Sequence, residues 1–117
     1  MNRGDVVLAD LPYSDASGSK VRPALVVQCD VNNARLDDVI LALITRNISR
    51  SGLEPTQLLI DPGTEAGKSS GLNFPSALKC SNLYTIDQQH VLATIGSLSP
   101  ALMRKVDDCL KAALGLP

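Results

Sequence analysis

The apolar pattern of this chain changes its period only once, near residue 99. Before that point the apolar residues form short runs with two-residue spacing or continuous aliphatic character, as in β-strands. After it they recur every four residues, on one face of a helix: Leu102, Val106, Leu110 and Leu114. Ser99 suits the N-cap, Pro100 the first helical position, and Gly115 the position just past the end. The pattern therefore predicts several strands followed by one amphipathic helix that packs against a sheet.

Small and polar residues divide the first part of the chain into separate elements. The expected strands lie at residues 4–11, 22–28, 37–45 and 56–61, with two shorter strands at 76–81 and 83–86. Residues 13–20 are expected to form a mobile polar loop, and the Gly-, Ser- and Pro-rich residues 61–76 a longer one. Residues 89–98 fit either a short strand or a helical turn. These elements predict an α+β fold in one domain, residues 1–117: a small, mostly antiparallel β-barrel with a C-terminal helix.

Composition limits the classes of partner that such a domain can have. The formal net charge is −1, which argues against a surface coated in basic charge that binds any polyanion. The chain has one Phe, two Tyr and no Trp, too few to build an extended base-stacking platform. Any contact with a nucleic acid should therefore be largely polar and confined to a local positive patch.

The cysteine pattern indicates a reducing compartment. Cys29, Cys80 and Cys109 are widely spaced and odd in number, so they do not fit a disulfide framework, and each is expected to be a small core residue. Only His90 could join them, and no Cys-x-x-Cys or His-x-x-x-His spacing occurs, so no metal site is expected. Without a signal segment or an apolar run long enough for a membrane, we expect a soluble cytoplasmic protein.

Several chemical motifs are better explained as ordinary structure. Gly63, Gly67 and Lys68 resemble a P-loop, but three residues rather than four separate the glycines. His90 has no orienting partner nearby in the sequence, and a lone histidine is more often structural. The adjacent pair Asp107-Asp108 would lie about 100° apart on a helix and makes no carboxylate dyad. None of these motifs predicts a catalytic site.

The segment SKVRPALVVQ, residues 19–28, places a cation at the front of a strand. Pro23 removes an N–H and favours an extended conformation at Arg22, which makes a rigid mount for a permanent positive charge. Lys20 lies two residues earlier, and Thr45 and Arg46 end the long third strand. One end of the sheet could thus gather three cations and a hydroxyl group.

An ordinary structural explanation of the same residues stays open. Arg22 could pair with Asp10 or Asp30 at the surface. Thr45 could be only a β-former, and Arg46 only a solvated charge that protects a sheet edge.

Six pieces of sequence, taken together and in order, extend over essentially the whole chain. They are Arg3-Gly4-Asp5-Val6-Val7, Arg22-Pro23-Ala24-Leu25-Val26-Val27, Ile44-Thr45, Gly71-Leu72, Ile95-Gly96-Ser97-Leu98 and the final helix. In these pieces the chain resembles the MazF/PemK/Kid family of toxins. The resemblance implies an SH3-like barrel that acts as a homodimer, cuts single-stranded RNA without a metal or other cofactor, and is silenced by a cognate antitoxin of a type II system.

The resemblance also assigns roles to single residues. Arg22 matches the catalytic arginine of the family and Thr45 its catalytic threonine. The residues expected to contact RNA near them are Lys20, Arg46, Lys79, Ser81 and Asn82. Arg46 stands where many members have serine, and Ser81-Asn82 where many have an acidic residue and glutamine. The second departure leaves open which group deprotonates the attacking hydroxyl.

Such a site would act on the charge of a phosphate rather than as a base. When the ribose 2′-hydroxyl attacks the adjacent phosphate, charge builds on the non-bridging oxygens, and an arginine fork suits that geometry. Two alternatives stay open: a non-catalytic toxin that binds a protein target, as the CcdB gyrase toxins do, or a degenerate toxin that keeps only antitoxin binding. The C-terminal segment has no aromatic anchor for a protein interface, which places the gyrase-type alternative second.

Overall fold

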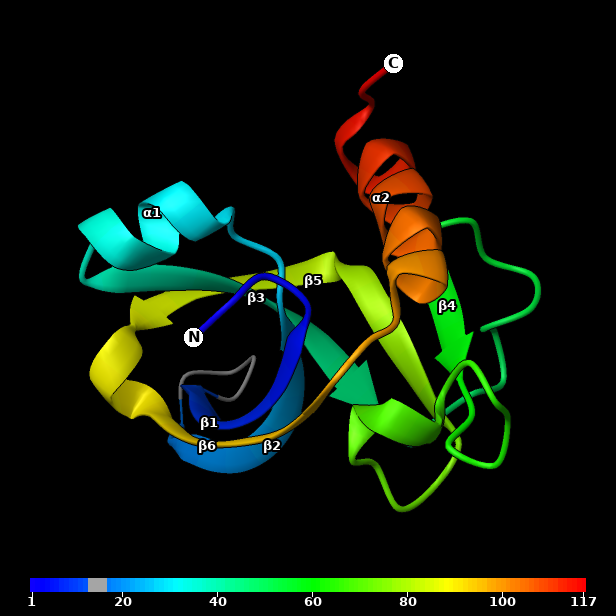
Figure 1. Cartoon of the computed structure of the whole chain (residues 1–117), viewed down its shortest axis with the longest axis horizontal. Helices are drawn as coiled ribbons and strands as arrows, with labels where there is room; N and C mark the ends of the chain where they lie inside the picture. The colour runs from blue at the N-terminus through cyan, green and yellow to red at the C-terminus, as the bar shows by residue number, and fades with distance from the viewer. Residues whose placement is uncertain (13–16) are drawn as a thin grey trace.

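A six-stranded antiparallel sheet with one long helix makes up the architecture (Figure 1). The computed structural model describes residues 1–12 and 17–117. The strands are β1 (Asp5–Pro12), β2 (Ser19–Val26), β3 (Asp38–Thr45), β4 (Gln57–Ile60), β5 (Ser76–Asp87) and β6 (Val91–Ser97). The helical elements are α1 (Asp30–Arg35), η1 (Lys68–Ser70), η2 (Gln88–His90) and α2 (Pro100–Leu114).

The sheet runs in the order β4-β5-β3-β2-β1-β6 and curls without closing. Every strand pair in it is antiparallel, and β4 and β6 form its two edges. The expected α+β class and antiparallel sheet are therefore confirmed, as a barrel-like sheet that stays open. The expected loop at residues 13–20 is only partly described, since residues 13–16 lie outside the described part and β2 already begins at Ser19.

The C-terminal helix begins and ends where the sequence predicts. The Ser99 hydroxyl accepts a hydrogen bond from the backbone N–H of Leu102 at 3.2 Å, and Gly115 ends the helix with a φ of 68°. Leu102, Val106 and Cys109 are its buried residues. Leu114, expected on the same face, is exposed at the last turn. Figure 1 shows α2 beside β4 and β5, the strands that it contacts.

Two hydrophobic clusters lie on opposite faces of the sheet, and β3 contributes to both. Ala42 and Ile44 belong to the cluster that includes Leu102 and Val106 of α2. Leu41 and Leu43 belong to the cluster inside the curl of the sheet. Because successive strand residues point to opposite faces, a strand buried on both sides must be continuously aliphatic. This explains the run VILALI.

A bulge interrupts the pairing of β5 with β3. Ala42 pairs with Leu83 whereas its neighbour Leu43 pairs with Lys79, so residues 80–82 have no partner on β3. The two short strands expected at 76–81 and 83–86 are thus halves of one bulged strand. Residues 89–98, ambiguous in the sequence, form the end of η2 and the strand β6.

The short helix α1 is absent from the sequence-based prediction. Its sequence, DVNNAR, carries no apolar stripe, and polar side chains hold it in place. The Gln28 amide nitrogen donates to Asn33 Oδ1 at 3.0 Å and to the Asp38 carbonyl at 2.8 Å. Asn33 Nδ2 in turn donates to the Gln28 carbonyl at 3.0 Å. Since buried amides need such partners, this network fixes the turn between β2 and β3.

Two glycines let the loop after β4 pack directly on the backbone of β6. A Cβ on Gly71, whose φ is +75°, would collide with the carbonyl of Ile95. A Cβ on Gly96 would collide with the backbone of Ser70. The loop expected at residues 61–76 is thus held against β6, where Ser69 Oγ also donates to the Ser97 carbonyl at 2.8 Å.

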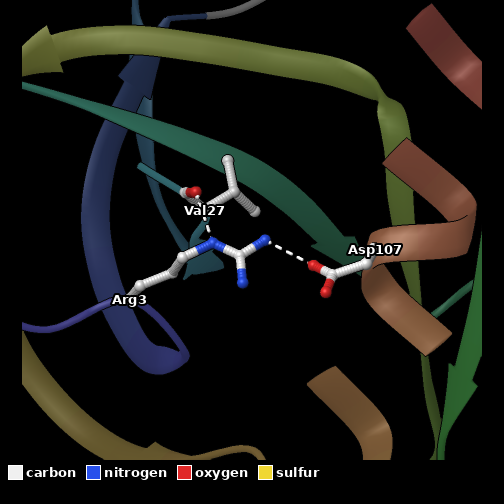
Figure 2. Close-up of polar contacts among 3 residues, drawn as sticks. All are labelled: Arg3, Val27 and Asp107. Atoms are coloured by element: carbon white, nitrogen blue, oxygen red, sulfur yellow. Dashed lines mark hydrogen bonds and ion pairs between the residues drawn. The ribbon is translucent and has the colours of Figure 1, made fainter. Parts of the chain in front are cut away.

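An arginine near the N-terminus joins three parts of the chain (Figure 2). Arg3 Nε donates to the Val27 carbonyl at 2.9 Å, and Nη2 contacts Asp107 Oδ1 of α2 at 2.7 Å. The backbone N–H of Arg3 donates to Asp30 Oδ1 at 2.6 Å. Arg3 therefore ties α2 to the segment that follows β2.

The cysteines divide into one exposed and two buried residues. Cys29 is exposed, so its expected place in the core is wrong; it lies in the turn that leads into α1. Cys80 and Cys109 are buried, as expected. Burial, together with the neighbouring Cys109 thiol, raises the pKa of Cys80 to about 12. Among the described residues, no helix is both long and apolar enough to cross a bilayer.

Candidate functional site

Strand register places Arg22 opposite Thr45. Ala24 of β2 pairs with Leu43 of β3, and the pairing of these strands stops there, one residue after Pro23. Continuing the same antiparallel register by two residues sets Arg22 across from Thr45, on the face that carries Ala24 and Leu43. Both side chains are half-buried. The two residues expected to be catalytic therefore come from neighbouring strands and face the same space.

That space is a cavity of about 430 Å³, hereafter the cation cavity. Four of the expected site residues line it: Arg22, Thr45, Lys79 and Asn82. The other polar residues that line it are Asn47, Ser49, Arg50, Gln57 and Tyr84. Leu43, a member of the inner hydrophobic cluster, contributes an apolar part of the wall. Polar side chains therefore line this end of the inner face of the sheet, next to the apolar Leu43.

Among the residues that the structure describes, three cations line the cation cavity without a charged partner. Arg22, Arg50 and Lys79 form no ion pair and no side-chain hydrogen bond with any residue that the structure describes. No carboxylate belongs to the described lining. The alternative that Arg22 pairs with Asp10 or Asp30 is not found in the described part of the chain. Unpaired positive charges that share a cavity favour a ligand with several negative charges.

Thr45 lines the cavity, and its hydroxyl makes one hydrogen bond, as an acceptor, with the described residues. The backbone N–H of Asn47 donates to Thr45 Oγ1 at 3.3 Å, which occupies an acceptor position of the hydroxyl. Asn47 Oδ1 accepts from the Ser49 hydroxyl at 2.8 Å, so the turn after β3 is held by its own side chains. The Thr45 O–H can therefore donate to a bound group.

The β5 bulge sets the positions of Ser81 and Asn82. Asn82 is half-buried and lines the cation cavity, as does Tyr84 two residues later. Ser81 is exposed and lines neither the cation cavity nor the hollow beside it. Its hydroxyl donates a hydrogen bond to Asn82 Oδ1 at 3.3 Å. A bulge next to a site commonly redirects a side chain in this way.

Lys20 and Arg46 lie beside the cation cavity rather than in it. They line a second hollow of about 350 Å³, hereafter the middle hollow, which shares Arg22 and Thr45 with the cation cavity. Arg46 is stacked on Phe74, with its guanidinium carbon 3.9 Å from the ring centroid. Of the five residues expected to contact RNA, two are thus in the cation cavity, two are in the middle hollow and Ser81 is outside both.

The sequence carries little signal for the remaining lining residues. Arg50 belongs to an irregular segment between β3 and β4, and its position depends on how that segment turns back. Gln57 reaches the cavity because β4 pairs with β5 so that Gln57 lies across from Lys79. A period-two pattern cannot reveal which strands become neighbours.

Comparison with known proteins identifies relatives along the whole chain. The model of the PemK-like, MazF-like toxins of type II toxin-antitoxin systems matches residues 2–114. The chain is 36% identical to the endoribonuclease EndoA of Bacillus subtilis (strain 168) over 117 residues, 99% of this chain and 96% of that protein.

Solved structures agree with this match. An endoribonuclease in complex with its cognate antitoxin, from a mycobacterial species, is 26% identical with a TM-score of 0.80, over 100% of this chain and 97% of that one. The Mycobacterium tuberculosis toxin MazF-mt6 is 26% identical with a TM-score of 0.77, over 97% and 98% of the two chains. With this fold and these relatives, the chain belongs to the PemK-like, MazF-like family of type II toxin-antitoxin toxins.

Proposed function

We propose that this chain is the toxin of a type II toxin-antitoxin system, and that it cleaves single-stranded mRNA without a metal ion. The observation that carries the proposal is the position of Arg22 opposite Thr45 in a cavity whose three cations have no partner among the described residues. The relatives support it, since EndoA and the mycobacterial protein are endoribonucleases.

The reaction is a transfer of the phosphate within the RNA chain. The ribose 2′-oxygen bonds to the adjacent phosphorus, its proton passes to water, and the bond from phosphorus to the 5′-oxygen breaks. The leaving 5′-oxygen takes up a proton. The products are a fragment that ends in a 2′,3′-cyclic phosphate and a fragment that begins with a 5′-hydroxyl.

Arg22 stabilises the charge that develops on the phosphate. Its guanidinium can donate two parallel hydrogen bonds to the non-bridging oxygens. Thr45 donates its hydroxyl proton to the same phosphate and fixes its orientation. Removal of one such donor commonly lowers the rate by about 10²- to 10³-fold.

Lys79 and Arg50 hold the substrate rather than act on the reacting bond. They line the same cavity from β5 and from the segment after β3, so they can contact phosphates on either side of the reacting one. Asn82 adds an amide that can hydrogen-bond a base or a ribose. The cavity therefore binds through charge and orients through neutral polar groups.

The proposal includes two protein partners. We expect a cognate antitoxin to cover the cation cavity with an acidic segment, because such a segment presents the same charge as the RNA backbone. We also expect a homodimer, since several large apolar side chains stay exposed on the single chain.

The test is RNA cleavage in the presence of EDTA. The wild type and Arg104→Ala, which removes an exposed arginine of α2, should cut a single-stranded RNA at the same sites. Arg22→Ala should cut at least 100-fold more slowly. Sequencing of the fragment ends should show 5′-hydroxyl groups. Cleavage by Arg22→Ala at the wild-type rate would contradict the assignment. A wild type that cuts no RNA but inhibits DNA gyrase, or that only binds an antitoxin, would contradict the proposed function.

A further inference from the structure

A hollow of about 170 Å³ lies beyond Arg22 and Thr45, and it shares no lining residue with the cation cavity. Its lining is mainly apolar and includes Leu8, Pro23, Leu72, Phe74 and Ile95, with Arg46 as its charged member. We name it the Phe74 hollow. It is smaller than the cation cavity and differs from it in chemistry, so the two suit different parts of a ligand.

Arg46 and Phe74 form a stacked pair at this hollow. The guanidinium carbon of Arg46 lies 3.9 Å from the ring centroid, while 50% of Phe74 stays exposed to solvent. Arg46 makes no ion pair with the residues that the structure describes. The pair thus presents an aromatic surface beside a positive charge, a combination that binds an aromatic ring attached to an anion.

The hollows follow one another in a continuous path. The cation cavity shares Arg22 and Thr45 with the middle hollow. The middle hollow in turn shares Pro23 and Arg46 with the Phe74 hollow. A strand that places its reacting phosphate between Arg22 and Thr45 therefore reaches the Phe74 hollow within its neighbouring nucleotide units.

We propose that the Phe74 hollow is a nucleobase subsite of the RNA substrate, an inference that rests on the proposed function. One unpaired base beside the scissile phosphate stacks on the Phe74 ring, and the Arg46 guanidinium contacts that base or its phosphate. A base is the occupant that the charge favours, because the path to the hollow is lined by Lys20, Arg22 and Arg46. Arg46 covers one face of the Phe74 ring, so the ring can stack a single base, and the hollow holds one nucleotide position of the substrate.

The experiment couples a base of the substrate with the ring of the protein. The probe is an RNA oligonucleotide that contains a mapped cleavage sequence, with a 2′-deoxyribose at the scissile nucleotide to block the reaction. Versions with an abasic ribose at each flanking position are compared by fluorescence anisotropy in the full-length wild type and in Phe74→Leu. At one position, base removal should weaken binding to the wild type by about 5- to 100-fold. In Phe74→Leu, the factor by which the same base removal weakens binding should be at least about threefold smaller than in the wild type.

Two further variants make the result specific. Phe74→Trp keeps an aromatic ring and should retain the wild-type penalty for base removal. Val31→Ala truncates an apolar side chain on α1 that is 74% exposed, and it should also retain that penalty. A urea titration of each variant establishes that it is folded.

The outcomes separate the subsite from the proposed function. If the wild type cleaves RNA and Arg22→Ala does not, yet every abasic penalty is the same in Phe74→Leu, the subsite is overturned and the function stands. If Phe74→Leu instead changes the sedimentation coefficient to that of a smaller species without altering any abasic penalty, the hollow binds a second copy of the chain and the subsite is again overturned. If the wild type cleaves no RNA, the proposed function itself fails.

Discussion

Where the loop that follows β4 contacts β6, a side chain in place of glycine has a conformational cost and a steric cost. Glycine substitutions can separate these two costs. Gly115→Ala carries only a conformational cost, since its φ is +68° and nothing lies within 4 Å of the added Cβ. A left-handed conformation costs a non-glycine residue about 1–2 kcal/mol. Gly96→Ala carries only a steric cost, since its Cβ would collide with the backbone of Ser70. Overpacking costs about 1–3 kcal/mol, and a backbone contact with little room to move belongs at the upper end.

Gly71→Ala combines both costs, because its φ is +75° and its Cβ would collide with the Ile95 carbonyl. We therefore expect it to lose about 4 kcal/mol of the free energy of unfolding, close to the sum of the two single costs. Gly52→Ala is the control, since its Cβ would meet nothing within 4 Å. The assay is urea unfolding followed by far-UV circular dichroism, with the four variants compared at a common m-value. Equal midpoints for Gly96→Ala and Gly52→Ala would refute the reasoning.

Three other predictions concern the buried thiol of Cys80, the ion pair between Arg3 and Asp107, and the cation cavity. Since burial raises the pKa of Cys80 from 9.0 to about 12, the folded state holds this proton more tightly than the unfolded chain. The resulting stability is complete below pH 9 and is lost as the pH rises toward 12. Between pH 8 and pH 10 the wild type should therefore lose about 1 kcal/mol more than Cys80→Ala in urea titrations. A double-mutant cycle with Arg3→Met and Asp107→Asn should give a coupling free energy of about 0.5–1 kcal/mol, because the two side chains are 29% and 46% exposed. A coupling free energy near zero would contradict a stabilising ion pair. Lys79→Met should reduce the slope of log K against log salt for single-stranded RNA by about 0.7, whereas Lys105→Met on α2 should leave the slope unchanged.

The parts of the fold that follow from local pattern were predictable from the sequence. The helix α2 has its N-cap, its proline and its terminal glycine within one continuous segment. The uninterrupted aliphatic run of β3 indicates that this strand is buried on both faces. Arg22 and Thr45 could be placed at the same end of the sheet because Arg22 begins the strand expected at residues 22–28 and Thr45 ends the strand expected at residues 37–45. In the structure β2 begins earlier, at Ser19, so Arg22 lies inside this strand, and register sets it across from Thr45.

The parts that depend on pairing between distant segments were not predictable. The bulge at residues 80–82 exists only because β5 pairs with β3 in two registers, and nothing in the residues themselves marks the change. Helix α1 is stabilised by buried amides rather than by an apolar stripe, so periodicity does not detect it. Arg50 and Gln57 enter the cavity through a long connection and a short edge strand.

The cation cavity brings together positive charges that have no ion-pair partner in the described part of the chain, and this arrangement favours binding at the expense of stability. Arg22, Arg50 and Lys79 repel one another in the free chain, and that repulsion is the same property that attracts a polyanion. Any polyanion that bridges them relieves the repulsion and raises the melting temperature, whether it is a substrate, an inhibitor or a contaminant carried through purification. The unbound toxin is then less stable than any of its complexes with a polyanion. An acidic antitoxin would therefore stabilise the toxin against unfolding and inhibit it at the same time.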